Sequence, residues 1–218
     1  MQKLPKWLKP YMDESAYEAV LTAVTRAEEI TSGEIVAMIV RRSSFTAHVP
    51  FLMTCFFAAF GATAAYSVSR AFPDIWHDGY FAVCLIAFSL VGLLLARFPA
   101  IQRIVLSKQE RANQVDQRAE LEFYEAGLEK TQGKTGILLF VSLFERRAVV
   151  LADSGIHSKL PSNTWENVVS LLVSGIKAKD MSGGFSRAID ACGTVLSEHF
   201  PIAPDDVNEL HNHLIVKD

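Results

Sequence analysis

Residues 136–152 read GILLFVSLFERRAVVLA, two apolar runs joined by a short polar turn from Phe144 to Arg147. Apolar runs of this length are typical of strands that are buried on both faces, and the short turn predicts that the two strands pair as an antiparallel hairpin. Upstream, residues 34–40 read EIVAMIV and predict a third buried strand, which we take to run parallel to the strand 136–142.

Amphipathic helices are predicted on either side of these strands. Asp13 and Ser15 are N-cap candidates for a helix that reaches Ala27, and a helix from about residue 109 to 130 is followed by a terminating Gly133. Two further helices, over 165–176 and 185–196, carry apolar residues at i, i+3, i+4 and i+7. Helices on both faces of a short mixed sheet predict the α/β class and a three-layer α/β/α sandwich.

Two stretches, residues 43–69 and 79–96, contain no Asp, Glu, Lys or Arg. As helices, even the shorter stretch would be about 27 Å long, close to the roughly 30 Å of a bilayer's hydrocarbon core. The alternative is a pair of buried helices in a soluble core, but the remaining chain is too short to cover both on all faces. We therefore expect residues 43–96 to form a two-helix transmembrane hairpin that interrupts the sandwich.

This hairpin divides the predicted domain into separate segments. Residues 1–42 supply the N-terminal helix and first strand, residues 97–202 supply the remainder, and residues 203–218 form a polar, loosely docked tail. Because an even number of spans returns the chain to the side it left, the two parts of the domain can meet.

Charge decides the expected orientation and excludes one class of partner. Basic residues gather before the first span and after the second, whereas the loop between them contains only Arg70. The positive-inside rule therefore predicts a multi-pass protein of the bacterial inner membrane with both termini in the cytoplasm. The net charge of −3 argues against a nucleic-acid partner, and three cysteines form neither a disulfide framework nor a zinc module.

Three segments carry a family likeness: GILLFVSLFERRAVVLADSGI at 136–156, KDMSGGFSRAI at 179–189 and TSGEIVAMIV at 31–40. Together they resemble the TPM domain, in the subgroup of bacterial membrane proteins that carry a transmembrane hairpin within the domain. The resemblance implies an α/β/α fold, binding of calcium or another divalent ion, a phosphatase activity reported for a plant relative, and roles in assembling or maintaining membrane complexes. Where the family usually has a Gly-aromatic-Gly turn, this chain has Asp153, Ser154 and Gly155, so only the second glycine is kept.

Strand direction brings one set of polar residues to the edge of the sheet away from the hairpin. Glu34 begins the first strand, while Asp153 and Ser154 follow the last one. Their oxygen atoms are the kind of ligand that Ca²⁺ or Mg²⁺ takes, and His157 is the histidine placed to join them. The alternative, which we favour, is an ordinary strand-to-helix turn at Asp153 with Glu34 solvated.

Two other loops hold candidate residues. Asp180 and Gly183 match the family's second polar loop but fall at the opposite end of the sheet, where a plain helix–helix turn is the favoured interpretation. Arg146 and Arg147 occupy the turn of the strand hairpin and face the membrane, where anionic lipid headgroups are available, although exposed turn arginines are also common.

Three functional hypotheses follow. The first is an interaction or assembly module that binds an unidentified membrane protein, with or without a divalent ion, because no nucleophile–base pair is recognisable. The second is a membrane-bound, metal-dependent, acid-phosphatase-like phosphohydrolase that uses Asp153 with Glu34. The third is a purely structural role in the membrane. We prefer the first to an enzyme.

Overall fold

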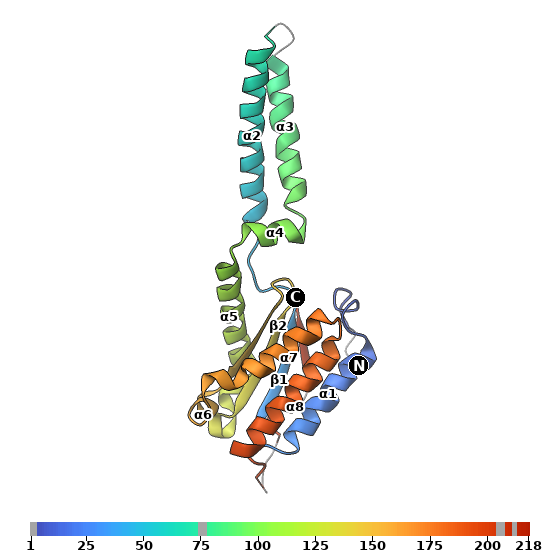
Figure 1. Cartoon of the computed structure of the whole chain (residues 1–218), viewed down its shortest axis with the longest axis vertical. Helices are drawn as coiled ribbons and strands as arrows, with labels where there is room; N and C mark the ends of the chain where they lie inside the picture. Colours follow the sequence, from blue (N-terminus) through green and yellow to red (C-terminus); the bar gives the residue numbers. More distant parts are fainter. Residues whose placement is uncertain (1–3, 74–77, 204–207, 211–212) are drawn as a thin grey trace. The chain divides into compact units, whose positions relative to one another are not determined.

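The computed structural model describes residues 4–73, 78–203, 208–210 and 213–218 (Figure 1). The elements follow in the order α1 (Glu14–Glu28), β1 (Glu34–Val40), α2 (Val49–Ala71), α3 (Asp78–Leu95), α4 (Pro99–Val105), α5 (Lys108–Glu125), η1 (Leu128–Lys130), η2 (Gln132–Lys134), β2 (Gly136–Ser142), β3 (Arg147–Ala152), α6 (Ser154–His157), η3 (Ser162–Trp165), α7 (Glu166–Lys177), α8 (Met181–His199) and β4 (Leu214–Lys217).

The chain divides into two compact units. Unit 1 comprises Met1–Ser43 and Ala112–Asp218, and unit 2 comprises Ser44–Arg111. Unit 1 therefore takes up the chain again at residue 112, later than the residue 97 expected from the sequence, because α4 and the first turn of α5 belong to unit 2.

Unit 1 is a mixed α/β fold built on an open four-stranded sheet with the order β3-β2-β1-β4. As predicted, β1 and β2 are parallel, with Glu34 opposite Gly136, and β2 and β3 are antiparallel. The expectation of a loosely docked tail is wrong for Leu214–Lys217, which forms β4 and pairs parallel to β1 from Ala37 to Val40. Backbone hydrogen bonds to β1 and burial of Leu214 hold this short strand in the sheet.

The two faces of the sheet are both covered, which explains why β1 and β2 are apolar at nearly every position. Alternate residues such as Ile35 and Leu139 pack with α1, α7 and α8, which lie side by side across one face in Figure 1. The intervening residues, such as Met38 and Phe140, pack against Val115, Ala119 and Phe123 of α5. Side chains of successive strand residues point to opposite faces, so one continuous apolar run serves both layers.

The helix ends follow local chemistry, with one departure from the sequence prediction. Asp13 caps α1 as expected, because its Oδ1 accepts a hydrogen bond from the backbone N–H of Ala16 at 2.8 Å. The helix predicted to continue to Lys130 ends at Glu125, because Gly127 adopts a left-handed conformation (φ 76°). Glycine tolerates this conformation without steric cost, and it starts the 3₁₀ turns η1 and η2 that lead into β2.

Unit 2 consists of α2 and α3 packed side by side, followed by α4. Among the described residues, α2 is long and apolar enough to cross a membrane by itself. α3 meets the same criterion only together with α4, and the two helices are bent by 96° at the break between them. Length and composition thus support one span, or two if the bent pair is counted as one, which is less than the two independent spans predicted from the sequence.

In unit 1, α7 and α8 approach each other closely at a pair of glycines. A Cβ atom added to Gly175 would lie 2.4 Å from the Cα of Gly184 and 2.8 Å from the carbonyl oxygen of Asp180. Both neighbours are backbone atoms, so neither can rotate away. The turn between the two helices therefore depends on the absence of a side chain at residue 175.

We expect Gly175→Ala to lower the free energy of unfolding of the full-length protein by about 1–3 kcal/mol, because the added methyl group forces α7 and α8 apart. Thermal unfolding in detergent, followed by near-ultraviolet circular dichroism, measures the change. Ser174→Ala, at the neighbouring exposed position of α7, is the matched control and should unfold like the wild type. Equal stability of Gly175→Ala and the control would contradict the close backbone approach.

Candidate functional site

Three chain segments meet where β1 and β4 end and β2 turns into β3. The N–H of Arg41 donates to the carbonyl of Lys217 at 3.0 Å, and the N–H of Leu143 donates to the carbonyl of Val40 at 3.1 Å. The N–H of Phe144 in turn donates to the carbonyl of Arg41 at 3.0 Å. We call residues 40–43, 143–147 and 217–218 the carboxyl edge of the sheet. Parallel sheets commonly place their ligands at this edge.

A buried carboxylate organises the carboxyl edge. Glu145 is 8% exposed, and each of its oxygens lies 3.2 Å from the N–H of Ser43, which donates to them. Its Oε2 also accepts a hydrogen bond from Ser142 Oγ, which lies 2.9 Å from Ser43 Oγ. The sequence predicted only that the β2–β3 turn is polar. In the structure, the buried Glu145 of this turn hydrogen-bonds to the chain just after β1.

The arginines of this edge differ in how firmly they are held. The guanidinium of Arg42 lies 4.1 Å from the centroid of the Phe144 ring, a cation–π contact. Burial lowers the pKa of Arg42 from its ordinary value, although the charge of Glu145 acts in the opposite direction. Arginine nevertheless keeps its proton at neutral pH.

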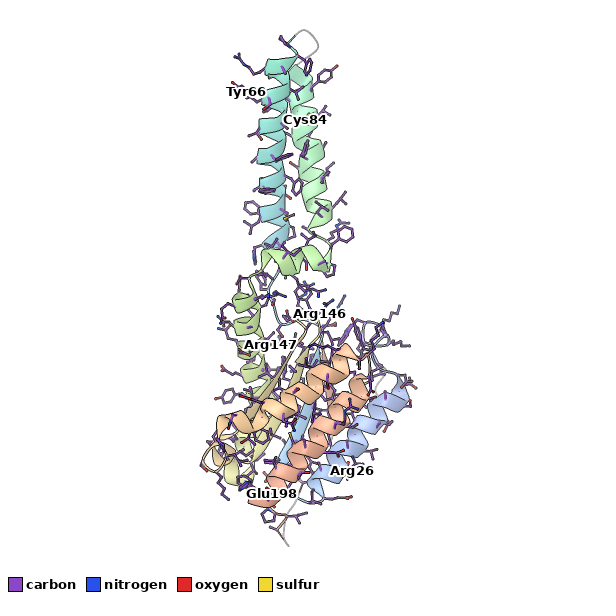
Figure 2. The ribbon with its side chains drawn as sticks, viewed as in Figure 1. Arg26, Tyr66, Cys84, Arg146, Arg147 and Glu198 are labelled. Atoms are coloured by element: carbon purple, nitrogen blue, oxygen red, sulfur yellow. The ribbon has the colours of Figure 1, made fainter. Side chains whose placement is uncertain are left out.

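The remaining arginines of the edge are Arg41, Arg146 and Arg147, and the last two lie where β2 turns into β3 (Figure 2). Arg147 forms a two-pronged ion pair with Asp116 of α5, at 2.9 and 3.0 Å from its Nη2. Arg41 is 63% exposed and reaches Asp218 only at 4.0 Å. Arg146 is exposed at the tip of the turn, where its backbone is left-handed (φ 55°).

A second buried carboxylate lies behind β4. Glu122 of α5 is completely buried, and it contacts Nη2 of Arg118 at 2.6 Å and Nζ of Lys217 at 2.5 Å. Lys217 also binds Glu125 at 2.7 Å. Glu122, Glu125 and Lys217 border a pocket of about 420 Å³ between α5 and strands β1 and β4. Sequence analysis missed this cluster, because Glu122 and Lys217 are 95 residues apart and Lys217 lies in a segment expected to be tail.

The ion pairs shift the pKa values of the cluster in opposite directions. Burial of the Lys217 ammonium lowers its pKa, but hydrogen bonds to Glu122 and Glu125 outweigh this effect and the pKa is raised overall. The hydrogen bond from Lys217 and its positive charge lower the pKa of Glu125. Both shifts favour the charged forms.

The residues predicted as metal ligands lie at the amino edge, where β1 and β2 begin. Asp153 donates its N–H to the carbonyl of Gly136 at 2.9 Å, and Gly136 is the partner of Glu34 in β1. Glu34 and Asp153 thus lie at the same edge of the sheet, as expected from the strand directions, and Gly136 lies between them. Gly155 packs so tightly that an added Cβ would lie 2.2 Å from the carbonyl oxygen of Gly133.

The side chains at the amino edge have separate partners. Oδ1 of Asp153 accepts hydrogen bonds from the N–H of Ser154 at 2.5 Å and from its Oγ at 3.0 Å, which caps the short helix α6. Glu34 is 6% exposed rather than solvated, and its Oε1 accepts from the N–H of Glu209 at 2.9 Å. His157 lines a groove beside β3, together with Trp165.

Asp180 is the N-cap of α8. Its Oδ1 accepts a hydrogen bond from the N–H of Gly183 at 3.0 Å, and its Oδ2 lies 3.3 Å from Nη1 of Arg187. The α7–α8 turn and α6 lie at opposite ends of unit 1 in Figure 1. Asp180 therefore belongs to a helix–helix turn, and the residues described in the structure contain no group of three or more His, Cys, Asp or Glu side chains placed to hold a metal ion.

Comparisons with known proteins bear on unit 1. The model of the TPM domain, named TPM_phosphatase, matches residues 101–195. The match covers less than half of the chain, so over these residues the chain is similar to the TPM domain. The match includes β2, β3, α7 and most of α8, whereas β1, also part of the resemblance, lies outside it.

A solved structure is also similar to the chain. It is the NMR structure of the BA42 protein from the psychrophilic bacterium Bizionia argentinensis, with a TM-score of 0.60 and 18% identity over 100% of both chains. At this identity the likeness concerns the fold alone. No curated protein matches the chain.

Lys217 gives the ion-pair cluster a direct test. Lys217→Met should lower the free energy of unfolding by about 2 kcal/mol, because Glu122 stays buried and keeps only Arg118 as a cationic partner. The same substitution at the exposed Lys130, whose contact with Glu129 is 4.0 Å long, is the control and should change little. Thermal unfolding in detergent measures both, and equal effects of the two substitutions would refute the role of Lys217.

The pKa shifts of Lys217 and Glu125 also predict how the difference in stability between wild type and Lys217→Met depends on pH. Because the pKa of Lys217 is raised above 10.5, its stabilisation is complete below pH 10.5 and is lost as pH rises through the folded-state pKa. Because the pKa of Glu125 is lowered below 4.5, its part is present above pH 4.5 and is lost as pH falls through its folded-state pKa. The difference in melting temperature between wild type and Lys217→Met should be flat from pH 5 to 10 and shrink beyond that range. A difference that grows above pH 10.5 would contradict the assignment.

Proposed function

We propose that the chain is an integral membrane protein in which α2 and α3 cross the bilayer as a hairpin. In this proposal the TPM-like unit 1 lies on the cytoplasmic side and acts as an interaction module in the assembly of a membrane complex. The proposal joins a membrane anchor, argued from unit 2, with a binding role, argued from unit 1.

The distribution of exposed apolar side chains carries the proposal. Of the 24 large apolar residues that are exposed in the described part of the chain, 19 lie within Ser44–Arg111. Only 11% of the most apolar window of α2 is buried inside the protein, whereas a core helix of a soluble protein would be mostly buried. Water disfavours an apolar surface of this extent, and the hydrocarbon of a bilayer accommodates it.

The packing within unit 2 supports a two-helix anchor. A Cβ added to Gly61 of α2 would lie 2.9 Å from the Cβ of Phe88, and one added to Gly92 of α3 would lie 2.6 Å from the carbonyl oxygen of Met53. Glycines that allow close helix approach are typical of membrane-spanning pairs. The chain bends sharply after α3 and continues as α4. In α4, Arg103 lies beside the exposed Ile104, a composition typical of a helix at a membrane interface.

A binding role is supported by the way unit 1 uses its acidic side chains. Asp153 and Asp180 cap helices, Glu145 fastens the β2–β3 turn, and Glu122 forms ion pairs with two cations. These carboxylates are engaged in holding the fold together. A domain whose carboxylates are used in this way is better suited to present a surface than to transfer a proton or phosphoryl group.

Two spans predict that both termini lie on the cytoplasmic side and the loop around residues 72–78 on the other. Cysteine-accessibility labelling of tags in intact cells and inverted vesicles should give this pattern, and the chain should stay in membranes washed with alkaline carbonate. Termini on opposite sides would leave α2 as the single span and contradict the hairpin.

A charge placed in α3 sharpens this test. Ile86→Lys lies at the middle of α3 and is expected to disfavour insertion by about 3 kcal/mol, moving the C-terminal tag to the outer side. Gly79→Lys, near the end of the helix, is the control and should keep the wild-type topology.

The binding role is tested separately. Mild crosslinking in native membranes should recover a reproducible protein partner with the wild-type chain.

A further inference from the structure

The cationic groups at the carboxyl edge of unit 1 differ in how closely an acidic side chain approaches them. Arg147 is paired with Asp116, and Lys217 with Glu122 and Glu125. By contrast, Arg41 has only a 4.0 Å contact with the exposed Asp218, and no acidic contact of the Arg146 side chain is found among the described residues. We propose that Arg41, Arg42 and Arg146 bind the phosphate groups of anionic lipids at the membrane surface, an inference that rests on the proposed membrane function.

Backbone hydrogen bonds bring these three arginines to one place. Phe144 N–H binds the carbonyl of Arg41, and Leu143 N–H binds the carbonyl of Val40, so the tip of the β2–β3 turn lies directly beside the end of β1. Glu145 secures this arrangement by accepting from the N–H of Ser43. The backbone that carries these cations is thus braced at the edge of the sheet, so it needs little ordering when the side chains bind.

The chemistry of these side chains suits phosphate. A guanidinium offers planar, paired N–H donors that match two phosphate oxygens, and it is less strongly hydrated than an ammonium. Arg42 lies over the Phe144 ring and is partly withdrawn from water, so less hydration must be lost on binding an anion.

The chain itself indicates why the anion should come from a lipid. Eight residues separate the end of β1 at Val40 from the start of α2 at Val49, and a chain of this length spans at most about 30 Å. If α2 enters the bilayer, Arg41 and Arg42 are tethered close to the headgroup layer. Tethering raises the effective concentration of headgroups to the millimolar range or above, where a few weak ionic contacts suffice.

The test uses the full chain in nanodiscs of phosphatidylcholine with or without phosphatidylglycerol. A phosphatidylglycerol with a photoreactive headgroup should label peptides that contain residues 41–44 and 143–146. Arg146→Asn, which tolerates the left-handed backbone, should reduce labelling at the carboxyl edge about fivefold. Lys134→Asn is the matched control: Lys134 is also exposed and left-handed (φ 57°), but it precedes β2 at the amino edge and should leave this labelling unchanged.

Three results would overturn the inference. These are equal labelling of the wild type and Arg146→Asn, an equal loss in Lys134→Asn, and labelling that inorganic phosphate abolishes at constant ionic strength, which would indicate a site for free phosphate. Carbonate resistance of each variant is measured in parallel. A chain that resists carbonate yet labels independently of Arg146 refutes only this inference, whereas a chain released by carbonate refutes the proposed membrane function.

Discussion

The parallel pairing of β1 with β2 is the contact on which the rest of the structure depends. These strands are neighbours through all seven residues of each, from Glu34 and Gly136 to Val40 and Ser142, yet 95 residues lie between them in sequence. Parallel strands always need a crossover, and the entropy of closing it grows only with the logarithm of its length. The sheet can therefore accept an insertion the size of unit 2, provided that the chain returns to the end of the sheet from which β2 can start.

This pairing also explains why the two edges of the sheet are built differently. At the amino edge the chain makes compact turns, in which Asp153 caps α6 and Gly155 packs on the backbone of residues 133–134. At the carboxyl edge, β1 is followed by the chain that leads to unit 2, and β4, the last strand in the sequence, ends beside it. Carboxylates that bind across chain segments hold this edge: Glu145 joins the β2–β3 turn to Ser43, and Glu122 joins α5 to Lys217.

The sequence predicted those parts of the fold in which local pattern and final environment agree. The strands β1, β2 and β3 are apolar because both their faces are covered, and the helices α1, α7 and α8 repeat apolar residues because one face packs on the sheet. The helical prediction failed after Glu125, where Gly127 breaks the pattern although the following residues favour a helix. β4 could not be recognised, because four residues in a polar tail become a strand only when β1 supplies the hydrogen bonds.

The polar residues were harder to predict than the apolar ones for a related reason. The position of Asp153 beside β2 followed from strand direction, but its use as a cap depends on where its own side chain turns. Glu122 and Glu145 would be read from sequence as surface residues, since burial of a charge is favourable only when its partners are already in place.

The buried charges around Lys217 also help to fix the register of the short strand β4 against β1. The apolar contacts of this four-residue edge strand specify its register only weakly, because Leu214 is buried but residues 215–217 are only half-buried. Ion pairs add little net stability when buried, but they are demanding in geometry. Lys217 reaches both Glu122 and Glu125 only in the observed register, and a shift of one residue would turn its side chain to the opposite face and leave Glu122 buried with one cation fewer. The ion pairs of Lys217 thus add electrostatic specificity to the burial of Leu214, where the strand is too short for apolar contacts alone to fix its register.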